Sequence, residues 1–211
     1  MSVRYRTVIN EAQAQIVIEK SKFIGYIRPV ETQEEAEAFV TSIRVMNRDA
    51  THNVPAYVLG EKFEIQKYSD DGEPSGTAGV PVVQMLVKEG ITNVAIVMTR
   101  YFGGIKLGTG GLVRAYTGIA KETLQAAGVA EVKDMDVMKA TIQYTHHGKA
   151  ENAGQKGLFS IRSTEFTDKV TLEVVCDPSD TESVRKNFME ITAGTVEFSD
   201  EHTELVKVPM Q

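Results

Sequence analysis

The sequence has one cysteine, no long apolar run and no excess of positive charge, and each absence excludes a class of protein. Cys176 alone cannot form a disulfide within the chain, and no cluster of cysteine and histidine has zinc-finger spacing. No apolar run approaches the roughly 20 residues of a membrane-spanning helix. Residues 1–5 lack the apolar core of a secretory signal. We therefore expect a cytoplasmic protein without a membrane segment, and we predict neither a metal ion nor another cofactor.

The net charge of −6 argues against a protein that binds nucleic acid through a generally basic surface. Residues 1–134 hold 15 Lys and Arg against 16 Asp and Glu, whereas residues 135–211 hold 8 against 13. Residues 94–121 contain four basic residues and no acidic residue. The sequence therefore permits a local basic surface on the first part of the chain, without a long-range field for polyanions.

Two glycine-rich segments, residues 70–79 and 100–111, bracket one predicted helix and one predicted strand. Five of the 17 glycines lie within residues 103–111, where an apolar strand leads into a helix. Glycine lets a backbone adopt positive φ or approach a ligand closely, and a plain connection needs only one or two turn residues. The second segment therefore indicates a site, although the same glycines also suit a tight connection that packs a helix close to a sheet.

The second segment has the chemistry of an anion site. A helix that begins near Thr109 presents free N–H groups and a partial positive charge at its first turn. Arg100, Lys106 and Arg114 add formal positive charge nearby. The spacing matches neither a Walker loop nor the dinucleotide-binding pattern. We predict a phosphate or carboxylate ligand at this segment.

Three further side chains suit the recognition of RNA. Tyr101 and Phe102 follow Arg100, and aromatic rings beside cations are what single-stranded RNA recognition uses, with core packing as the alternative. His52 precedes a predicted strand, where its imidazole either faces the glycine-rich segments or is an ordinary surface residue.

The acidic residues of the first segment allow two interpretations. Asp70, Asp71 and Glu73 carry carboxylates of the kind that hold Mg²⁺ together with a substrate phosphate. They equally suit pairing with the basic residues and capping of a helix that begins near Thr77, which would neutralise the predicted anion site. Ser75 lacks the Gly-x-Ser-x-Gly pattern of a nucleophile elbow.

Periodicity predicts an α+β chain with two domains, residues 1–134 and 135–211. In the first, we expect strands at 4–9, 54–59, 63–68 and 94–98, one long strand or two at 15–29, and a turn at 10–14 that makes the first two strands neighbours. The apolar strand at 94–98 is expected to be central and covered on both faces. Helices are expected at 33–46, with Thr32 as the N-cap, at 79–90 and at 109–128. This order favours one mixed sheet with helices on one face. In the second, strands at 137–144, 160–166, 169–176 and 195–198 and helices at 147–158 and 180–193 give the βαββαβ order of a ferredoxin-like domain.

Four segments of the first domain resemble the IMPACT family of bacterial and eukaryotic proteins. They read KSKFI at 20–24, THNVPAY at 51–57, DDGEPSGTAG at 70–79 and RYFGGIKLG at 100–108. The resemblance implies a first domain like domain 2 of ribosomal protein S5 and a ferredoxin-like second domain like the last domain of translocating elongation factors. It also implies a role in translation: eukaryotic relatives act in translational control, and nucleic-acid or ribosome binding is the usual proposal for bacterial relatives.

Two functional hypotheses follow. The first is a non-enzymatic binding protein that engages RNA, the ribosome or translation factors and regulates translation. Its predicted contacts are Lys22, His52, Arg100, Tyr101, Gly103, Gly104, Lys106, Gly108, Thr109, Gly110 and Arg114. The second is a small-molecule enzyme, a hydrolase or transferase, that acts on a phosphorylated ligand at the two glycine-rich segments and uses Asp70, Asp71 and Glu73 as a magnesium site.

Overall fold

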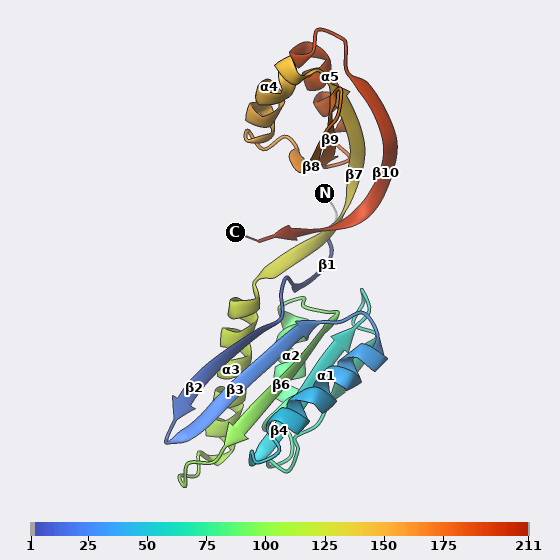
Figure 1. Cartoon of the computed structure of the whole chain (residues 1–211). Helices are drawn as coiled ribbons and strands as arrows, with labels where there is room; N and C mark the ends of the chain where they lie inside the picture. Colours follow the sequence, from blue (N-terminus) through green and yellow to red (C-terminus); the bar gives the residue numbers. More distant parts are fainter. Residues whose placement is uncertain (1–2, 211) are drawn as a thin grey trace. The chain divides into compact units, whose positions relative to one another are not determined.

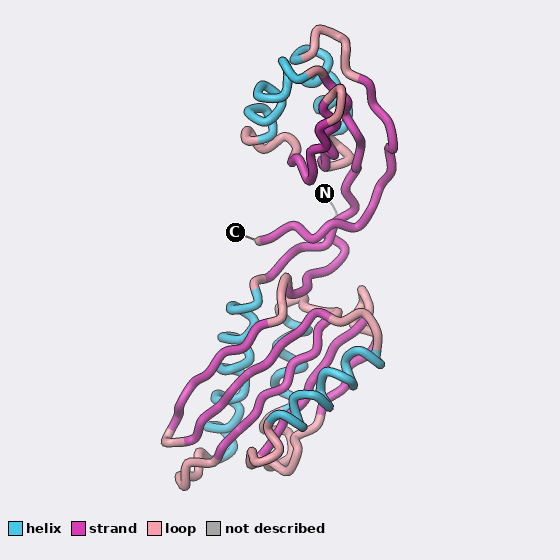
Figure 2. Tube along the Cα trace, viewed as in Figure 1, coloured by secondary structure: helices cyan, strands magenta, loops and turns pink. Residues whose placement is uncertain are grey.

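The computed structural model describes residues 3–210, which form two compact units (Figures 1 and 2). The N-terminal unit is Arg4–Val132 together with residues 207–210, and the C-terminal unit is Lys133–Val206 with Val3. The division falls inside two long strands, β7 (Val129–Ile142) and β10 (Glu197–Pro209). No helix of the described residues has both the length and the apolar character that crossing a membrane requires.

A five-stranded antiparallel sheet forms the centre of the N-terminal unit. Its strands are ordered β2 (Ala12–Ile18), β3 (Ser21–Pro29), β6 (Val94–Tyr101), β4 (His52–Leu59) and β5 (Ile65–Tyr68). The central strand β6 is buried on both faces, as its run of apolar and β-branched residues predicted. Val94, Ile96 and Met98 face one core cluster, and Ala95 and Val97 face the other.

Helices cover both faces of this sheet. We expected a mixed sheet with helices on one face, and both parts of that expectation were wrong, because all the strand pairs are antiparallel and both faces carry helices. α1 (Gln33–Met46) packs on one face, and α2 (Gly79–Lys88) and α3 (Gly108–Ala127) pack on the other (Figure 1). The reason is the apolar character of β6, which leaves neither face fit for solvent. The predicted N-cap of α1 is confirmed, since the Thr32 hydroxyl accepts a hydrogen bond from the Glu35 N–H at 3.2 Å.

The first strand, β1 (Val3–Val8), pairs with β7 and not with β2, so the predicted neighbours were wrong. β2 instead forms a hairpin with β3, and Glu19 and Lys20 turn the chain with φ of 44° and 63°. Residues 15–29 therefore belong to two strands. The turn between the two strands contains Glu19 and Lys20 and lacks the glycine that is usual in a tight turn.

The C-terminal unit has the predicted βαββαβ order. Along the chain it is β7, α4 (Tyr144–Gly154), β8 (Ser160–Phe166), β9 (Val170–Cys176), α5 (Thr181–Ile191) and β10. β9 and β10 each pair with β7, and β8 pairs with β9. Phe188 of α5 and Leu172 of β9 are fully buried in the core of this unit.

Candidate functional site

The candidate site lies at one end of the N-terminal sheet, where β3 and β4 begin and β6 ends. Strand pairing brings these ends together, since Phe23 and His52 are both partners of Arg100. A cleft of about 420 Å³ opens there. Its lining comes from four segments: Thr51, His52, Glu73, Pro74, Arg100, Phe102, Lys106, Leu107, Gly108, Thr109 and Leu112.

A buried ion pair forms the floor of the site. The Arg100 guanidinium donates from Nη1 to Glu73 Oε1 at 2.7 Å, and the two side chains are only 6% and 3% exposed. The Tyr116 hydroxyl donates to the same oxygen at 2.7 Å. Burial first, and then the Glu73 carboxylate, raise the pKa of Tyr116 far above its ordinary value, so the phenol keeps the proton that it donates.

His52 lies beside this ion pair and contacts the backbone of the first glycine-rich segment. Its Nδ1 lies 2.7 Å from the Asp71 carbonyl oxygen, and a carbonyl only accepts, so Nδ1 carries a proton. Its Nε2 lies 3.8 Å from Glu73 Oε1 and belongs to a side chain that is 18% exposed. The ring therefore lies next to the buried carboxylate, and both residues line the cleft.

The Arg100 guanidinium has one donor without an acceptor. Its Nη2 donates to Ser21 Oγ at 3.4 Å, and its central carbon lies 5.3 Å from the ring centroids of Phe23 and Phe102. Within the described residues, the buried Nε–H has no hydrogen-bond partner. The expectation that Arg100 carries an unneutralised charge was wrong, because Glu73 is its counterion, as the competing interpretation of the acidic segment allowed.

The N-terminus of α3 faces the cleft without a cap. Leu107 occupies the N-cap position, offers no side-chain hydrogen bond, and the first turn contains no acid. The N–H groups of Gly108, Thr109 and Gly110 have no acceptor among residues 3–210. Lys106 precedes them, is exposed, and makes no ion pair within the same range. Gly104 and Gly108 adopt φ of 88° and 69° to bring the chain to this point.

Gly103 has a structural role that requires glycine. A Cβ there would lie 2.1 Å from the backbone carbonyl of Lys20, and its N–H donates to Ser21 Oγ at 3.2 Å. The loop between β6 and α3 therefore packs directly on the turn between β2 and β3. At this position the glycine serves close packing, which was the alternative reading of the segment.

Two of the predicted contacts lie on the other face of the sheet. Lys22 and Tyr101 are paired residues of β3 and β6, and strand alternation points them away from Arg100. The Lys22 ammonium lies 4.5 Å from the Tyr101 ring centroid, and the Tyr101 hydroxyl donates to Asn47 Oδ1 at 3.0 Å. Burial and the nearby Asp49 carboxylate raise the pKa of Tyr101. Arg114 is exposed on α3 and does not line the cleft, so the expected convergence of all the cations was wrong.

The carboxylates of the first segment bind protein donors. Asp70 accepts from the N–H groups of Gly76, Ala78 and Gly79 at 2.8, 3.1 and 2.8 Å, and so caps α2. Asp71 accepts from the Asn53 N–H at 2.6 Å and pairs with Arg44 at 3.3 Å. Within residues 3–210, no group of three or more His, Cys, Asp or Glu is arranged to hold a metal ion.

Sequence reasoning did not single out the Tyr116 hydroxyl or Thr51. Tyr116 is fully buried on α3, and its hydroxyl binds Glu73, a residue 43 positions away in the sequence. The Thr51 hydroxyl accepts from the Phe102 N–H at 3.0 Å and fixes the start of the loop after β6. Neither contact has a local signal in the sequence.

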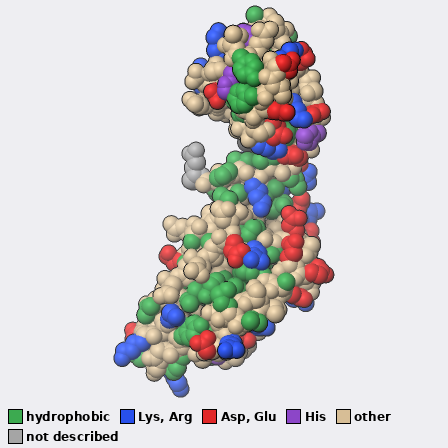
Figure 3. Space-filling view, in the orientation of Figure 1, with side chains coloured by type: hydrophobic (Ala, Val, Ile, Leu, Met, Phe, Trp, Pro, Cys, Tyr) green, Lys and Arg blue, Asp and Glu red, His purple; other side chains and the backbone are tan. Residues whose placement is uncertain are grey.

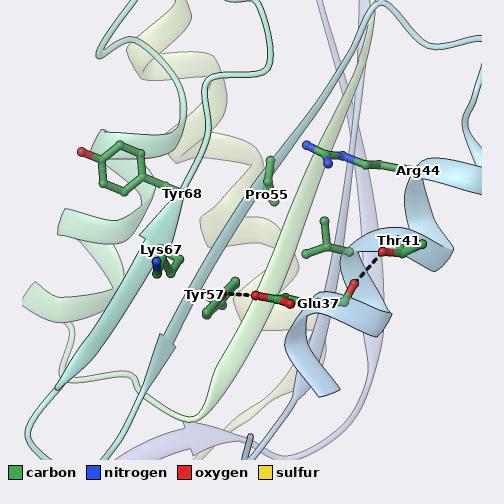
Figure 4. A pocket seen from close by; sticks show the side chains of 8 residues that line it. Glu37, Thr41, Arg44, Pro55, Tyr57, Lys67 and Tyr68 are labelled. Atoms are coloured by element: carbon green, nitrogen blue, oxygen red, sulfur yellow. Dashed lines mark hydrogen bonds between the residues drawn. The ribbon is translucent and has the colours of Figure 1, made fainter. Parts of the chain in front are cut away.

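A separate pocket lies between α1 and β5 (Figure 4). In it the Tyr57 hydroxyl donates to Glu37 Oε1 at 3.2 Å, and partial burial with this carboxylate raises the pKa of Tyr57. The Thr41 hydroxyl donates to the Glu37 carbonyl at 2.8 Å. This pocket contains none of the predicted site residues, and its Glu37, Thr41 and Tyr57 side chains are engaged in these hydrogen bonds.

Comparison with known proteins identifies relatives over nearly the whole chain. Residues 19–124, half of the chain, match the Impact N-terminal domain, and residues 141–195 match a domain of unknown function (DUF1949). The IMPACT family member YvyE of Bacillus subtilis is 43% identical over 90% of this chain and 88% of its own length. The IMPACT family member YigZ of Escherichia coli is 39% identical over 62% of this chain and 64% of its own.

Among solved structures, the crystal structure of an hypothetical protein is similar with a TM-score of 0.58 and 28% identity. The match covers 92% of this chain and 95% of that one. The motifs at 20–24, 51–57, 70–79 and 100–108 all lie inside the region that matches the Impact N-terminal domain. On these matches, the chain belongs to the IMPACT family.

Proposed function

We propose that the chain is a non-enzymatic binding protein that acts in translation in the cytoplasm and binds single-stranded RNA at the cleft beside α3. One observation carries the proposal: the uncapped N-terminus of α3 stands beside exposed Phe102 and beside Lys106, for which residues 3–210 provide no ion-pair partner. The role in translation rests on the family to which the chain belongs and on what the resemblance implies for its relatives.

The three groups at the cleft have complementary tasks in binding a nucleotide. Free N–H groups at a helix N-terminus bind phosphate oxygens, and Lys106 supplies a positive charge to the same anion. Phe102 is 46% exposed and offers ring surface on which a base can stack. Stacking tolerates any base, so we expect little sequence preference.

The overall charge limits how RNA is held. With a net charge of −6, the chain has no general attraction for a polyanion. On the face that Figure 3 shows, Lys and Arg side chains stand among Asp and Glu side chains rather than forming one continuous basic field. The proposed contact is therefore local and neutralises few phosphates.

The proposal is tested by titrating a short, fluorescently labelled single-stranded RNA at several salt concentrations and following its anisotropy. We expect log Kobs to fall with log salt at a slope of about −0.7 for each phosphate contacted. Lys106→Ala should lower the affinity and reduce the slope by about one contact. Lys121→Ala, which removes an exposed lysine from α3 outside the cleft, is the matched control and should bind as the wild type does. An affinity independent of salt, or equal effects of the two variants, would overturn the proposal.

A second candidate is an enzyme that acts on a phosphorylated small molecule in the same cleft. The observation in its favour is that His52 and Glu73 both line the cleft, so an imidazole and a carboxylate adjoin the anion site. Its magnesium-dependent form predicts ligand binding that requires the metal and is abolished by Asp71→Asn. In the structure the Asp71 carboxylate already accepts from Asn53 and Arg44, which favours the binding protein.

A further inference from the structure

We infer that the cleft binds a terminal phosphate monoester, as found at the end of an RNA strand or on a free nucleotide, rather than a phosphate within the strand. This inference rests on the proposed function, because it names which part of the RNA occupies the site. It is carried by the number of free donors, by the charge of the cleft, and by a buried donor of Arg100 that has no acceptor.

The donors at the cleft suit a group with three terminal oxygens and a double charge better than one with two oxygens and a single charge. Gly108 and Thr109, which line the cleft, and Gly110, which follows them, offer three free N–H groups, and Lys106 offers an ammonium. The Thr51 hydroxyl accepts from Phe102 and keeps its own proton available. An internal phosphodiester has two terminal oxygens and one negative charge. A monoester has three terminal oxygens and a charge between about −1.5 and −2 at neutral pH. The monoester is the better match to this set.

The charge of the cleft also favours a dianion. The Arg100 guanidinium and the Glu73 carboxylate neutralise each other at 2.7 Å. What remains is the Lys106 charge, to which the helix end adds about half an elementary charge. No acid lies in the first turn of α3 to balance them.

Arg100 supplies an observation that is independent of the helix end. The residue is 5% exposed and lines the cleft, and its Nε–H has no acceptor among the described residues. Burying such a donor without a partner destabilises the protein. Its other donors already bind Glu73 and Ser21. A phosphate oxygen bound in the cleft would give Nε–H the acceptor that the protein does not provide.

The size of the site agrees with a terminal group. A cleft of about 420 Å³ is in the range of small-molecule sites, about 300–1,000 Å³. Pro74, Leu107 and Leu112 form apolar parts of its wall. We expect a single nucleotide to occupy the cleft with its phosphate at α3 and its base on Phe102.

The test compares four forms of one short single-stranded RNA: with a 5′-phosphate, with a 3′-phosphate, with both, and with hydroxyl groups at both ends. Binding is measured by anisotropy at one salt concentration, with an internal label so that both ends are free. We expect a phosphorylated end to raise the affinity about tenfold or more over the hydroxyl form, since one charge-assisted hydrogen bond accounts for that factor. The 5′ and 3′ forms identify which end is bound, and a nucleoside 5′-monophosphate should compete.

Two variants of Thr109 separate this site from general binding. Thr109→Asp places a carboxylate at the helix end and should abolish the preference for a phosphorylated end, whereas Thr109→Asn, similar in size but uncharged, should keep most of it. Thr109 is exposed, so both variants are expected to fold. Arg100→Lys keeps a positive charge near Glu73 without the Nε–H and should also reduce the preference.

The outcomes distinguish the two proposals. If all four RNA forms bind equally, the terminal-phosphate inference is overturned while RNA binding stands. If no RNA binds but calorimetry shows that a nucleoside monophosphate does, the inference stands and the RNA function is overturned. If neither binds, both are overturned.

Discussion

The N-termini of α2 and α3 are alike in local structure, since each helix begins after a glycine-rich segment. They differ in whether a side chain of the protein accepts hydrogen bonds from the free N–H groups of the helix end. Both helices follow a glycine-rich segment at one end of the N-terminal sheet. At α2, the Asp70 carboxylate accepts from Gly76, Ala78 and Gly79. At α3, no side chain caps the helix. Glycine content alone therefore does not identify a ligand site; the deciding feature is whether the segment carries its own acceptor.

Charge composition explains the difference. The segment before α2 contains three acids, whereas residues 94–121 contain none. A carboxylate close to free N–H groups folds onto them, because the bond is charge-assisted. Where no acid is within reach, the N–H groups of the helix end remain available to water or to an anionic ligand. Four substitutions would break or sharpen this contrast.

The largest effect is expected from Glu73→Gln, which removes the counterion of Arg100. Leaving a buried charge without its partner costs about 3–5 kcal/mol of unfolding free energy. The measurement is urea-induced unfolding followed by circular dichroism. Glu11→Gln, which breaks the exposed pair with Arg28, is the matched control and should cost less than about 1 kcal/mol. Similar losses in the two variants would contradict a buried pair at the floor of the cleft.

Gly103→Ala should have the next largest effect. Its Cβ would lie 2.1 Å from the Lys20 backbone, which cannot rotate away as a side chain can. We expect a loss of about 1–3 kcal/mol in the free energy of unfolding. Gly110→Ala is the control: its Cβ meets only the end of the Arg114 side chain at 3.5 Å, and alanine favours the helix by about 0.5–1 kcal/mol. A stabilised Gly103→Ala variant would refute the close approach of the two loops.

Asp70→Ala tests the capped helix end, the N-terminus of α2. Loss of its hydrogen bonds to the start of α2 should lower the unfolding free energy by about 1–2 kcal/mol. Thermal unfolding measures the change, and Ser75→Ala in the same segment, an exposed residue, should change stability by less than about 0.5 kcal/mol. If Asp70→Ala is as stable as the wild type, the capping role is wrong.

Thr109→Asp tests the uncapped N-terminus of α3. Its effect on stability should be the smallest of the four, and it should stabilise the protein where the other three substitutions destabilise it. An acid in the first turn of α3 interacts favourably with the helix dipole, so the unfolding free energy should rise by about 0.3–1 kcal/mol. The same variant should bind RNA more weakly than the wild type does. Stability that falls with Thr109→Asp but not with Thr109→Asn would mean that the helix end is not electropositive.

The fold was predicted where the signal is local and missed where it is not. The Thr32 cap, the buried strand β6 and the βαββαβ order of the second unit each follow from a contiguous pattern. The pairing of β1 with β7 depends on long-range contacts that no segment encodes alone. The helices on both faces of the sheet had a local signal in the apolar strand β6, which the expectation of helices on one face did not use.

The candidate site was predicted in part for the same reason. The helix end with Lys106 and Gly108 follows from neighbouring residues, and the structure brings both to the cleft. Pairing of Glu73 with Arg100 was one of two interpretations, and only the fold decides between them. The separation of Tyr101 from Arg100 has a signal that could have been used, because successive residues of a strand point to opposite faces.

The path of β10 has a consequence for how the protein is made. Residues 207–210 belong to the N-terminal unit, and the Met210 N–H donates to the Val129 carbonyl at 2.9 Å. A polypeptide that emerges from the ribosome in order can form the sheet of β2 to β6 early, but it gains this contact only after residues 133–206 have been added. A fragment that stops after residue 134 would lack the contact permanently.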